Sequence, residues 1–440
     1  MIIPKTFKLG GLSLKVDTQL IPQLGLFNAS LPTVATIALD PKNLEGFTWE
    51  VTPGQEIREE MLLAKNLQKN LYVYSSIPGT LLNIKDVVLP DGKQTQAAVI
   101  RLEGSFSRTG KVVKTRAWRE VDSAKLWKTI VELGILLKPN TLEPAEEISL
   151  PPPPVKKLII NGVSSEPYIT TGRTLLSHSS KEIRMGIGIL QKIFNPEKTF
   201  LTLDHEDKEL IQDWETLKDP GNIKHVEPVL LAAKYPQALK SLICETLFET
   251  TDLRHGSLWK DHGILILDLE TFFHIYEAVC LGKPLTERFV SLAGQGLNSP
   301  KILKVRVGTP LATLVEDCGG LKETPSQVVS GGVFSGFSVK DYGFSVQATT
   351  DGVLFLAKDE VHGSSTQDCT RCGLCINYCP AGIQPVEIYR SLRAERWDLA
   401  KNEGVLSCLE CGLCSFVCPS RIPLRDWFRA SKLRESGVEN

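Results

Sequence analysis

The sequence predicts a multidomain protein that combines α/β and α+β folds. At 440 residues the chain is too long for one hydrophobic core, so three or four domains are expected. Strand and helix patterns alternate from about residue 157 to 281, which is typical of a parallel α/β sheet. The region 365–440 holds eight of the eleven cysteines, in two copies of one pattern.

Composition and charge exclude several classes of protein. Lys and Arg number 50 against 51 Asp and Glu, so the net charge of −1 gives no electrostatic reason to expect nucleic acid as a partner. No uninterrupted apolar stretch reaches the ~18–20 residues of a membrane helix, so we expect no transmembrane segment. The start "MIIPKTFKLGGLSLKV" lacks the apolar core of a signal peptide, which predicts a cytoplasmic location.

Short β segments separated by turns fill residues 30–105. Turns are expected at Pro53-Gly54, Pro78-Gly79 and Asp91-Gly92. The stretches "VTPGQEI" and "SSIPGTLLNI" resemble the barrel-sandwich domains of biotinyl and lipoyl carriers. No Met-Lys-Met tip for covalent modification is present, so we expect a structural or docking domain over residues 1–110, with an N-terminal arm.

Residues 111–283 are expected to form the α/β domain. A helix is predicted within 120–150, and the run "LPPPPV" at 150–155 is a stiff extended connector because proline fixes φ and lacks an N–H donor. The strand "KKLIING" follows, then a helix at about 180–193, the strands "TFLTLD" and "HGILILDL", and a helix to about 281. Residues 284–360 read as a small α+β module, and 361–440 as a mostly helical domain.

The cysteine pattern is C-x2-C-x2-C-x3-C-P. It occurs at Cys369, Cys372, Cys375 and Cys379, and again 39 positions later at Cys408, Cys411, Cys414 and Cys418. In bacterial two-cluster ferredoxins, three such thiolates bind one [4Fe-4S] cluster and the fourth binds the other cluster. We therefore expect one set of Cys369, Cys372, Cys375 and Cys418, and a second set of Cys408, Cys411, Cys414 and Cys379.

Structural zinc is the competing interpretation of these cysteines. Zinc sites favour paired C-x2-C knuckles or mixed Cys and His ligands, and neither motif contains a histidine. Gly373 and Gly412 permit bends that turn backbone amides towards the sulfurs. The other three cysteines, Cys244, Cys280 and Cys318, lie alone in apolar stretches and are expected to be buried and unreactive.

Taken together, these features resemble the C subunit of Rnf-type complexes, membrane-bound ion-translocating enzymes that exchange electrons between ferredoxin and NAD. Matching stretches include "LIINGVSSEPYIT", "KYPQALKSLI", "GKPLTERFVSLAG", "VRVGTPLATL" and "VVSGG". The resemblance implies a barrel-sandwich domain, a Rossmann-like α/β domain, a β-grasp (soluble-ligand-binding-like) module over 284–360 and a two-cluster ferredoxin domain, in that order. The A subunit of sodium-pumping NADH:quinone reductase shares only the first three domains.

The chain departs from this family where flavin and nicotinamide phosphates would bind. The family's glycine-rich loop corresponds to a segment with one glycine, Gly134, and with Glu143, Glu146 and Glu147, which would repel phosphate. The motif Asn-Gly-Ala-Glu-Cys-Glu-Pro-Tyr appears as Asn161-Gly162-Val163-Ser164-Ser165-Glu166-Pro167-Tyr168. We therefore predict a degraded FMN and NADH site. Glu166 and Lys240 remain as candidates for it, with a capping Glu and a surface Lys as the alternative interpretations.

The resemblance predicts a peripheral electron-transfer subunit on the cytoplasmic face of the inner membrane, relaying single electrons through two [4Fe-4S] clusters to membrane subunits. The alternative is a relay or docking module for ferredoxin or flavodoxin that binds no NADH or FMN. No catalytic residue is expected in the chain itself under either hypothesis.

Overall fold

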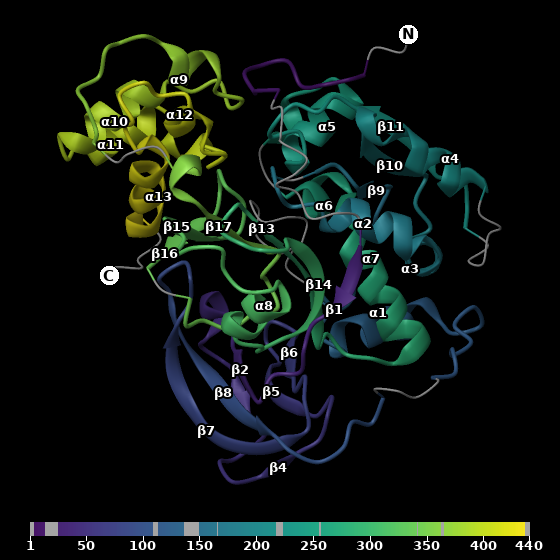
Figure 1. Cartoon of the computed structure of the whole chain (residues 1–440). Helices are drawn as coiled ribbons and strands as arrows, with labels where there is room; N and C mark the ends of the chain where they lie inside the picture. The colour runs from purple at the N-terminus through teal and green to yellow at the C-terminus, as the bar shows by residue number, and fades with distance from the viewer. Residues whose placement is uncertain are drawn as a thin grey trace.

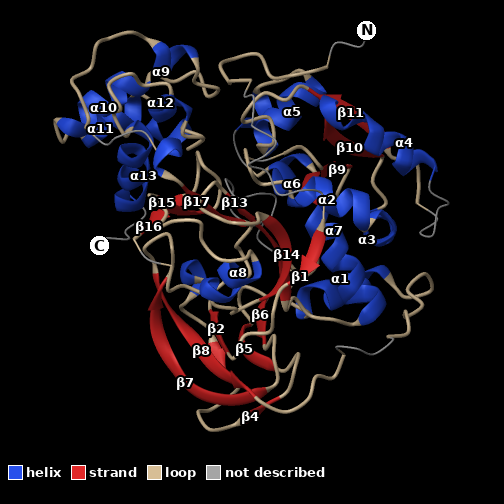
Figure 2. Cartoon of the chain, viewed as in Figure 1, coloured by secondary structure: helices blue, strands red, loops and turns tan. Residues whose placement is uncertain are grey.

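The computed structural model describes residues 4–13, 25–108, 113–135, 149–164, 166–216, 223–254, 257–340, 342–361 and 365–435. Figure 1 shows four packed parts: a β-rich part at the bottom, an α/β part at the upper right, a mixed sheet in the centre and a helical part at the upper left. Figure 2 shows that strands dominate the bottom part and helices the upper left part.

The β-rich part consists of two antiparallel sheets that share one core. The sheets run β2-β8-β7-β4 and β3-β5-β6. Their strands are β2 (Val34–Ala38), β3 (Thr48–Trp49), β4 (Glu56–Ile57), β5 (Leu62–Asn66), β6 (Leu71–Tyr74), β7 (Gly79–Val88) and β8 (Gln94–Leu102). Alternate side chains such as Ala35 and Ile37 are buried, as expected for strands with one covered face.

Two of the three turns predicted in this part are confirmed. Gly54 and Gly92 lie in turns with φ of 86° and 82°, a region that glycine enters without steric cost. The turn predicted at Pro78-Gly79 is wrong, because Gly79 is the first residue of β7. A Cβ at Gly79 would lie 1.8 Å from the Arg101 carbonyl oxygen, so this glycine permits close approach of β8 instead.

The α/β part has a parallel sheet of order β11-β10-β9-β12. Its strands are β9 (Lys157–Asn161), β10 (Lys198–Asp204), β11 (Glu227–Leu231) and β12 (Ile264–Asp268). Its helices are α1 (Ser123–Glu132), α2 (Thr171–His178), α3 (Ser180–Phe194), α4 (Lys208–Thr216), α5 (Lys240–Phe248), α6 (Leu258–His262) and α7 (Leu269–Tyr276). The predicted alternation of strands and helices is confirmed. Successive strands β9, β10 and β11 are added towards one edge of the sheet, whereas β12 is added on the other side of β9, so the strand order reverses between β9 and β12.

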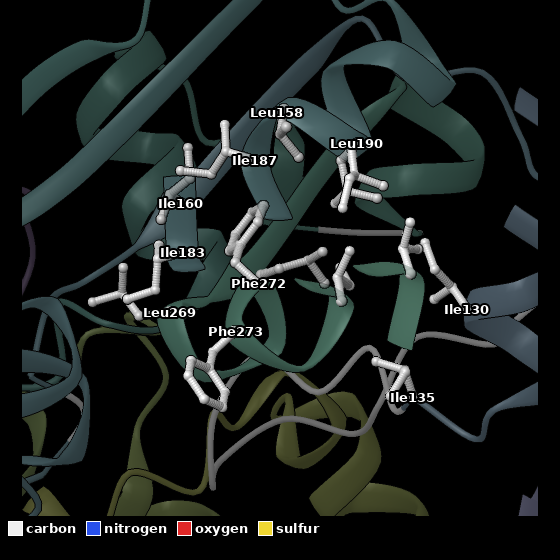
Figure 3. Packing of buried hydrophobic residues seen from close by; sticks show 14 of the residues in the cluster. Ile130, Ile135, Leu158, Ile160, Ile183, Ile187, Leu190, Leu269, Phe272 and Phe273 are labelled. Carbon is white, nitrogen blue, oxygen red and sulfur yellow. The ribbon is translucent and has the colours of Figure 1, made fainter. Parts of the chain in front are cut away.

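Apolar faces of α1, α3 and α7 form the main core of this part. Figure 3 shows Ile187 and Leu190 of α3 beside Leu158 of β9 and Phe272 of α7. A Cβ at Gly186 would lie 2.0 Å from the Phe272 carbonyl oxygen, so α3 and α7 cross closely at this glycine.

The central part is a mixed sheet of order β1-β14-β13-β17-β15-β16 with α8 (Leu311–Asp317) packed on it. Its strands are β1 (Leu26–Asn28), β13 (Glu287–Ala293), β14 (Lys301–Arg306), β15 (Gln327–Ser330), β16 (Phe337–Val339) and β17 (Gly352–Leu356). The N-terminal strand β1 pairs in parallel with β14, so a segment before the β-rich part completes a sheet built mainly from residues 287–356.

The helical part holds both cysteine motifs. Its helices are α9 (Leu374–Asn377), α10 (Pro385–Arg393), α11 (Trp397–Asn402), α12 (Leu413–Phe416) and α13 (Leu424–Glu435). Ile388, Leu392 and Phe428 form its core, and four of the motif cysteines pack against that core. This small core lies next to the metal ligands expected from the sequence.

The described helices include none with both the length and the apolar character needed to cross a membrane. The three isolated cysteines are confirmed as buried. Cys244, Cys280 and Cys318 have no exposed surface, and burial raises the pKa of Cys280 and Cys318 to about 12.

Candidate metal centres

The two cysteine motifs fold into loops of the same shape. Arg371 in the first loop and Glu410 in the second have left-handed φ angles of 57° and 54°. This conformation directs each amide N–H at the sulfur two residues earlier, with 3.4 Å to Cys369 Sγ and 3.3 Å to Cys408 Sγ. Amides that donate to sulfur stabilise negative charge on a metal-bound thiolate.

A glycine follows the second cysteine of each loop and starts a short helix. Gly373 and Gly412 have φ of 76° and 77°, and α9 and α12 begin directly after them. These helices carry the third cysteines, Cys375 and Cys414. The bends predicted at the two glycines are therefore present.

A cysteine of the second motif, Cys418, lies near Cys375 of the first loop. Burial raises the pKa of Cys375, and the nearby sulfurs of Cys418, Cys369 and Cys372 raise it further. The second loop shows the same arrangement with the motifs exchanged. Burial raises the pKa of Cys414, and the nearby sulfurs of Cys408, Cys411 and Cys379 raise it further. These neighbours are the members of the two crossed sets expected from the spacing, and the binding of a cluster by each set stays a prediction.

The second set of cysteines lines a partly open pocket. Cys379, Cys408, Cys411 and Cys414 line it, together with apolar side chains that include Phe428. In the part of the chain that the structure describes, no three His, Cys, Asp or Glu side chains come close enough together to hold one metal ion. These four sulfurs are the groups that would hold the second cluster.

Exposure distinguishes the two sets. Cys369 and Cys372 of the first loop are exposed to solvent, whereas Cys411 and Cys379 of the second set are only 8% and 9% exposed. A Cβ at Gly373 would meet no atom within 4 Å, but one at Gly412 would lie 2.4 Å from the Phe334 carbonyl oxygen. The first set therefore faces solvent and the second faces the rest of the protein.

Charged side chains of α13 hold the second loop. Glu410 accepts hydrogen bonds from Arg429 at 3.0 Å and from Lys432 at 3.1 Å, and Lys432 also donates to the Cys408 carbonyl oxygen at 2.7 Å. Burial alone would raise the pKa of Glu410, but Lys432 and Arg429 outweigh it and hold the pKa below its usual value. Sequence reasoning missed these contacts because Arg429 and Lys432 lie 19 and 22 residues after Glu410 in the chain.

The N-terminal arm, residues 4–13, packs against the same region. Gly11 N donates to the Tyr378 carbonyl oxygen at 3.1 Å, and Leu12 exchanges two backbone hydrogen bonds with Tyr235 of the α/β part. Figure 1 shows this purple segment crossing the top of the molecule near α5. A Cβ at Gly10 would lie 2.5 Å from the Cys379 carbonyl carbon, so the arm lies directly against a cysteine of the second set.

Glu166, a sequence candidate for the flavin pocket, is buried between the α/β part and the central part. Its carboxylate accepts hydrogen bonds from the amides of Phe334 and Ser335, at 3.1 and 2.9 Å, and from the Tyr235 hydroxyl at 3.2 Å. Burial raises its pKa to about 7, although these hydrogen bonds oppose the shift. Tyr235 and Phe334 were not singled out in the sequence, where no local pattern marks them.

Lys240, the other candidate, is the first residue of α5 and is 7% exposed. The alternative interpretation of a surface lysine is therefore wrong. Neither Lys240 nor Glu166 is among the residues that line the cleft of the α/β part.

That cleft lies at the carboxyl ends of β9 and β12, the two strands between which the strand order of the sheet reverses. Ligands of open α/β sheets bind at this type of position. Its lining comprises Asn161, Gly162, Val163, Ser164, Ile169, Thr171, Gly172, Arg173, Asp268, Leu269, Glu270 and Asp351.

Backbone donors in the cleft are already used within the protein. The amides of Gly162, Val163 and Ser164 donate to Thr202 O, Asn161 Oδ1 and Asp204 Oδ2. The described lining therefore offers no free amide at this loop to cradle a phosphate.

The charges of the cleft also disfavour a phosphate. Arg173 pairs with Asp207 at 2.8 Å. Burial raises the pKa of Asp268 to about 6, with the nearby Glu270 contributing. The described lining does not fit a phosphate-bearing cofactor. Ser165, Glu143, Glu146 and Glu147, also named in the sequence prediction, lie outside the described residues.

Three domain models match the chain. Residues 142–277 match the Nuo51 FMN-binding domain, residues 289–341 the NQRA C-terminal domain, and residues 365–422 the 4Fe-4S dicluster domain. The order of these matches agrees with a multidomain α/β architecture ending in an iron–sulfur domain.

Curated relatives match over most of the chain. The C subunit of the proton-translocating ferredoxin:NAD(+) oxidoreductase complex of Clostridium ljungdahlii is 30% identical, covering 76% of this chain and 73% of the relative. The C subunit of the Na(+)-translocating ferredoxin:NAD(+) oxidoreductase complex of Acetobacterium woodii is 26% identical, covering 76% and 75%. The C subunit of the ion-translocating oxidoreductase complex of Rhodobacter capsulatus is 32% identical over 62% of this chain and 53% of the relative. The chain belongs to this family, the C subunits of ion-translocating Rnf-type oxidoreductase complexes, and is an electron-transfer subunit.

Proposed function

We propose that this subunit relays single electrons through two [4Fe-4S] clusters, bound by Cys369, Cys372, Cys375 and Cys418 and by Cys408, Cys411, Cys414 and Cys379. The observation that supports the proposal is that Cys418 neighbours Cys375 in the first loop and Cys379 neighbours Cys414 in the second, in two loops of equal shape. When bound, each cluster supplies a site that accepts and releases one electron at a time.

The protein's own residues shape the cysteine loops and donate hydrogen bonds to the sulfurs. The amides of Arg371 and Glu410 donate to sulfur, and the glycines after Cys372 and Cys411 make room for the bend. Thiols must lose their protons to bind iron, so the raised pKa values of Cys408 and Cys414 mean that loading releases protons from a buried site.

The unequal exposure of the two loops supports an order for the relay. The first set, with the exposed Cys369 and Cys372, is the exchange point with other proteins, and the second set is the inner station. Partners would be the membrane subunits of the same complex on the cytoplasmic face of the inner membrane, with ferredoxin or flavodoxin as soluble exchange proteins.

A second candidate function is a relay or docking module that binds no NADH or FMN. It is the alternative named from the sequence, and the described loop amides of the cleft are bonded within the protein. We derive no flavin or nicotinamide step for this chain.

The finer architecture is part of the proposal. We propose a barrel-sandwich domain over 1–110, a Rossmann-like domain over 111–283, a β-grasp module over 284–360 and a dicluster domain over 361–440. The sheet orders support these assignments, with the qualification that β1 joins the sheet of the third domain.

The test is anaerobic iron, sulfide and flavin analysis of one sample of the full chain. We expect about eight irons and eight sulfides per chain. Zinc or disulfides in their place would overturn the relay. Binding of FMN or NADH with micromolar affinity, measured by calorimetry, would remove the second candidate and leave the first.

A further inference from the structure

A five-residue loop, Gly332–Gly336, joins the dicluster part to the α/β part. On one side the amides of Phe334 and Ser335 donate to Glu166. On the other side Arg425 donates to the Phe334 carbonyl oxygen and Arg429 donates to the Ser335 carbonyl oxygen at 3.0 Å. The loop is therefore held between a carboxylate of one part and two guanidinium groups of the other.

Glu166 fits this place closely. It is 2% exposed, and a Cβ on Gly332 would lie 2.2 Å from its Cδ, so the loop can approach the carboxylate only because residue 332 is glycine. A buried carboxylate is costly unless donors satisfy it, and the amides of Phe334 and Ser335 both donate to Glu166. The contacts with the 332–336 loop therefore account for the burial of Glu166, which does not line the cleft of the α/β part.

Tyr235 lies between Glu166 and the second cysteine loop. Its hydroxyl lies 3.2 Å from Glu166 Oε1 and 2.7 Å from the Cys411 carbonyl oxygen. The centroid of its ring lies 4.7 Å from that of Phe334, and the Phe334 ring centroid lies 4.9 Å from that of Phe416. The second loop therefore rests on a buried aromatic pair with a hydroxyl and a carboxylate behind it.

The first loop has no counterpart to this support among the described residues. Cys369, Thr370, Arg371 and Cys372 are all exposed, and Gly373 has open space where Gly412 meets Phe334. Local geometry is the same in both loops, so a difference between the bound clusters must come from the surroundings.

We propose that Glu166 and Tyr235 are positioning residues that set the reduction potential of the second cluster apart from that of the first. The proposal rests on the proposed function, because it needs both clusters to be present. A reduced cluster carries one more negative charge. The Tyr235 hydroxyl dipole aimed at Cys411 therefore favours the reduced state, whereas the negative charge of Glu166 disfavours it.

The two residues thus have opposite signs of effect. Removing the hydroxyl in Tyr235→Phe is expected to lower the potential of the second cluster. Removing the charge in Glu166→Gln is expected to raise it, because the negative charge that disfavours the reduced state is then absent. A role limited to folding predicts no such opposition.

The experiment is a redox titration of the full, anaerobically reconstituted chain, followed by low-temperature EPR. It is done about two pH units above the pKa of about 7 of Glu166, where this carboxylate is ionised. Cys372→Ser identifies the signal of the first cluster. Glu387→Gln, which removes a half-exposed carboxylate of α10 that is paired with Arg390, is the control for loss of charge.

We expect each variant to change the reduction equilibrium of the second cluster about tenfold, equivalent to about 59 mV for one electron, in opposite directions. The first cluster and the Glu387→Gln control should not move. Shifts of equal sign, shifts in both clusters, or no shift would overturn the proposal, as would loss of iron from both variants. If only one variant loses iron, the sign of the shift in the other decides. Wild-type protein without iron would refute the proposed function instead.

Discussion

The loops at Cys369 and Cys408 have the same backbone and different neighbours. Both have a left-handed third residue, an amide directed at sulfur and a glycine that starts a short helix. The first loop faces solvent, whereas the second is covered by residues 332–336, by Tyr235 and by the N-terminal arm. The comparison shows that the motif determines the backbone conformation of the cysteine loop, while distant segments of the chain determine the environment of that loop.

The largest expected effect tests the crossing of the ligands. Cys418→Ser should remove the exposed cluster although Cys418 belongs to the second motif, and Cys379→Ser should remove the buried cluster. Iron should fall from about eight to about four per chain in each variant, measured on anaerobic samples. If Cys418→Ser removes the buried cluster instead, each motif binds its own cluster and the crossed grouping is wrong.

The next effect uses the matched glycines. Gly373→Ala and Gly412→Ala both force alanine into a left-handed conformation, which costs roughly 1–2 kcal/mol. Only at Gly412 would the new Cβ also lie 2.4 Å from a backbone oxygen, that of Phe334. We expect Gly412→Ala to destabilise the protein by about 2 kcal/mol more than Gly373→Ala, measured by thermal unfolding under anaerobic conditions. Equal losses would mean that the second loop is not packed against the 332–336 loop.

A pH dependence should be associated with the second loop. The pKa of Glu166 is raised from 4.5 to about 7 in the folded chain, so the folded state holds its proton more tightly than the unfolded state does. Its contribution to stability is therefore greatest below pH 4.5 and is lost as the pH rises towards about 7, by at most about 3 kcal/mol.

Glu166→Gln should remove this dependence. The unfolding midpoints of wild type and variant, compared from about pH 5 to 8, should diverge as the pH rises, with the wild type losing more. Parallel curves would show that Glu166 is not buried as described.

The smallest effect concerns the third residue of each loop. Glu410→Gln weakens charge-assisted hydrogen bonds to Arg429 and Lys432 and should cost about 1–2 kcal/mol. Arg371→Gln, at the equivalent exposed position, should change stability by less than about 0.5 kcal/mol. Urea unfolding of both variants measures the difference, and a larger loss at Arg371 would reverse the comparison.

Local features were predictable from the sequence because their causes are local. The alternation of apolar runs indicated the parallel sheet, from β9 to β12. The crossed grouping inferred from the cysteine spacing stays a prediction. Gly54 and Gly92 indicated turns correctly, but Gly79 did not, since its cause is the carbonyl oxygen of Arg101 on a neighbouring strand.

Contacts between distant segments could not be predicted in this way. Glu166 was singled out, but its partners Phe334 and Ser335 lie 168 and 169 residues away in the chain. The pairing of β1 with β14 joins residues about 275 positions apart, and no local pattern records either contact.

The most direct test of the central claim is the relaxation of the two EPR signals in the presence of a soluble paramagnetic ion. The ion should accelerate the relaxation of one cluster only, and that signal should be the one that Cys418→Ser abolishes. Equal acceleration of both signals, or acceleration of the signal that survives in Cys418→Ser, would contradict an exposed first cluster and a buried second one.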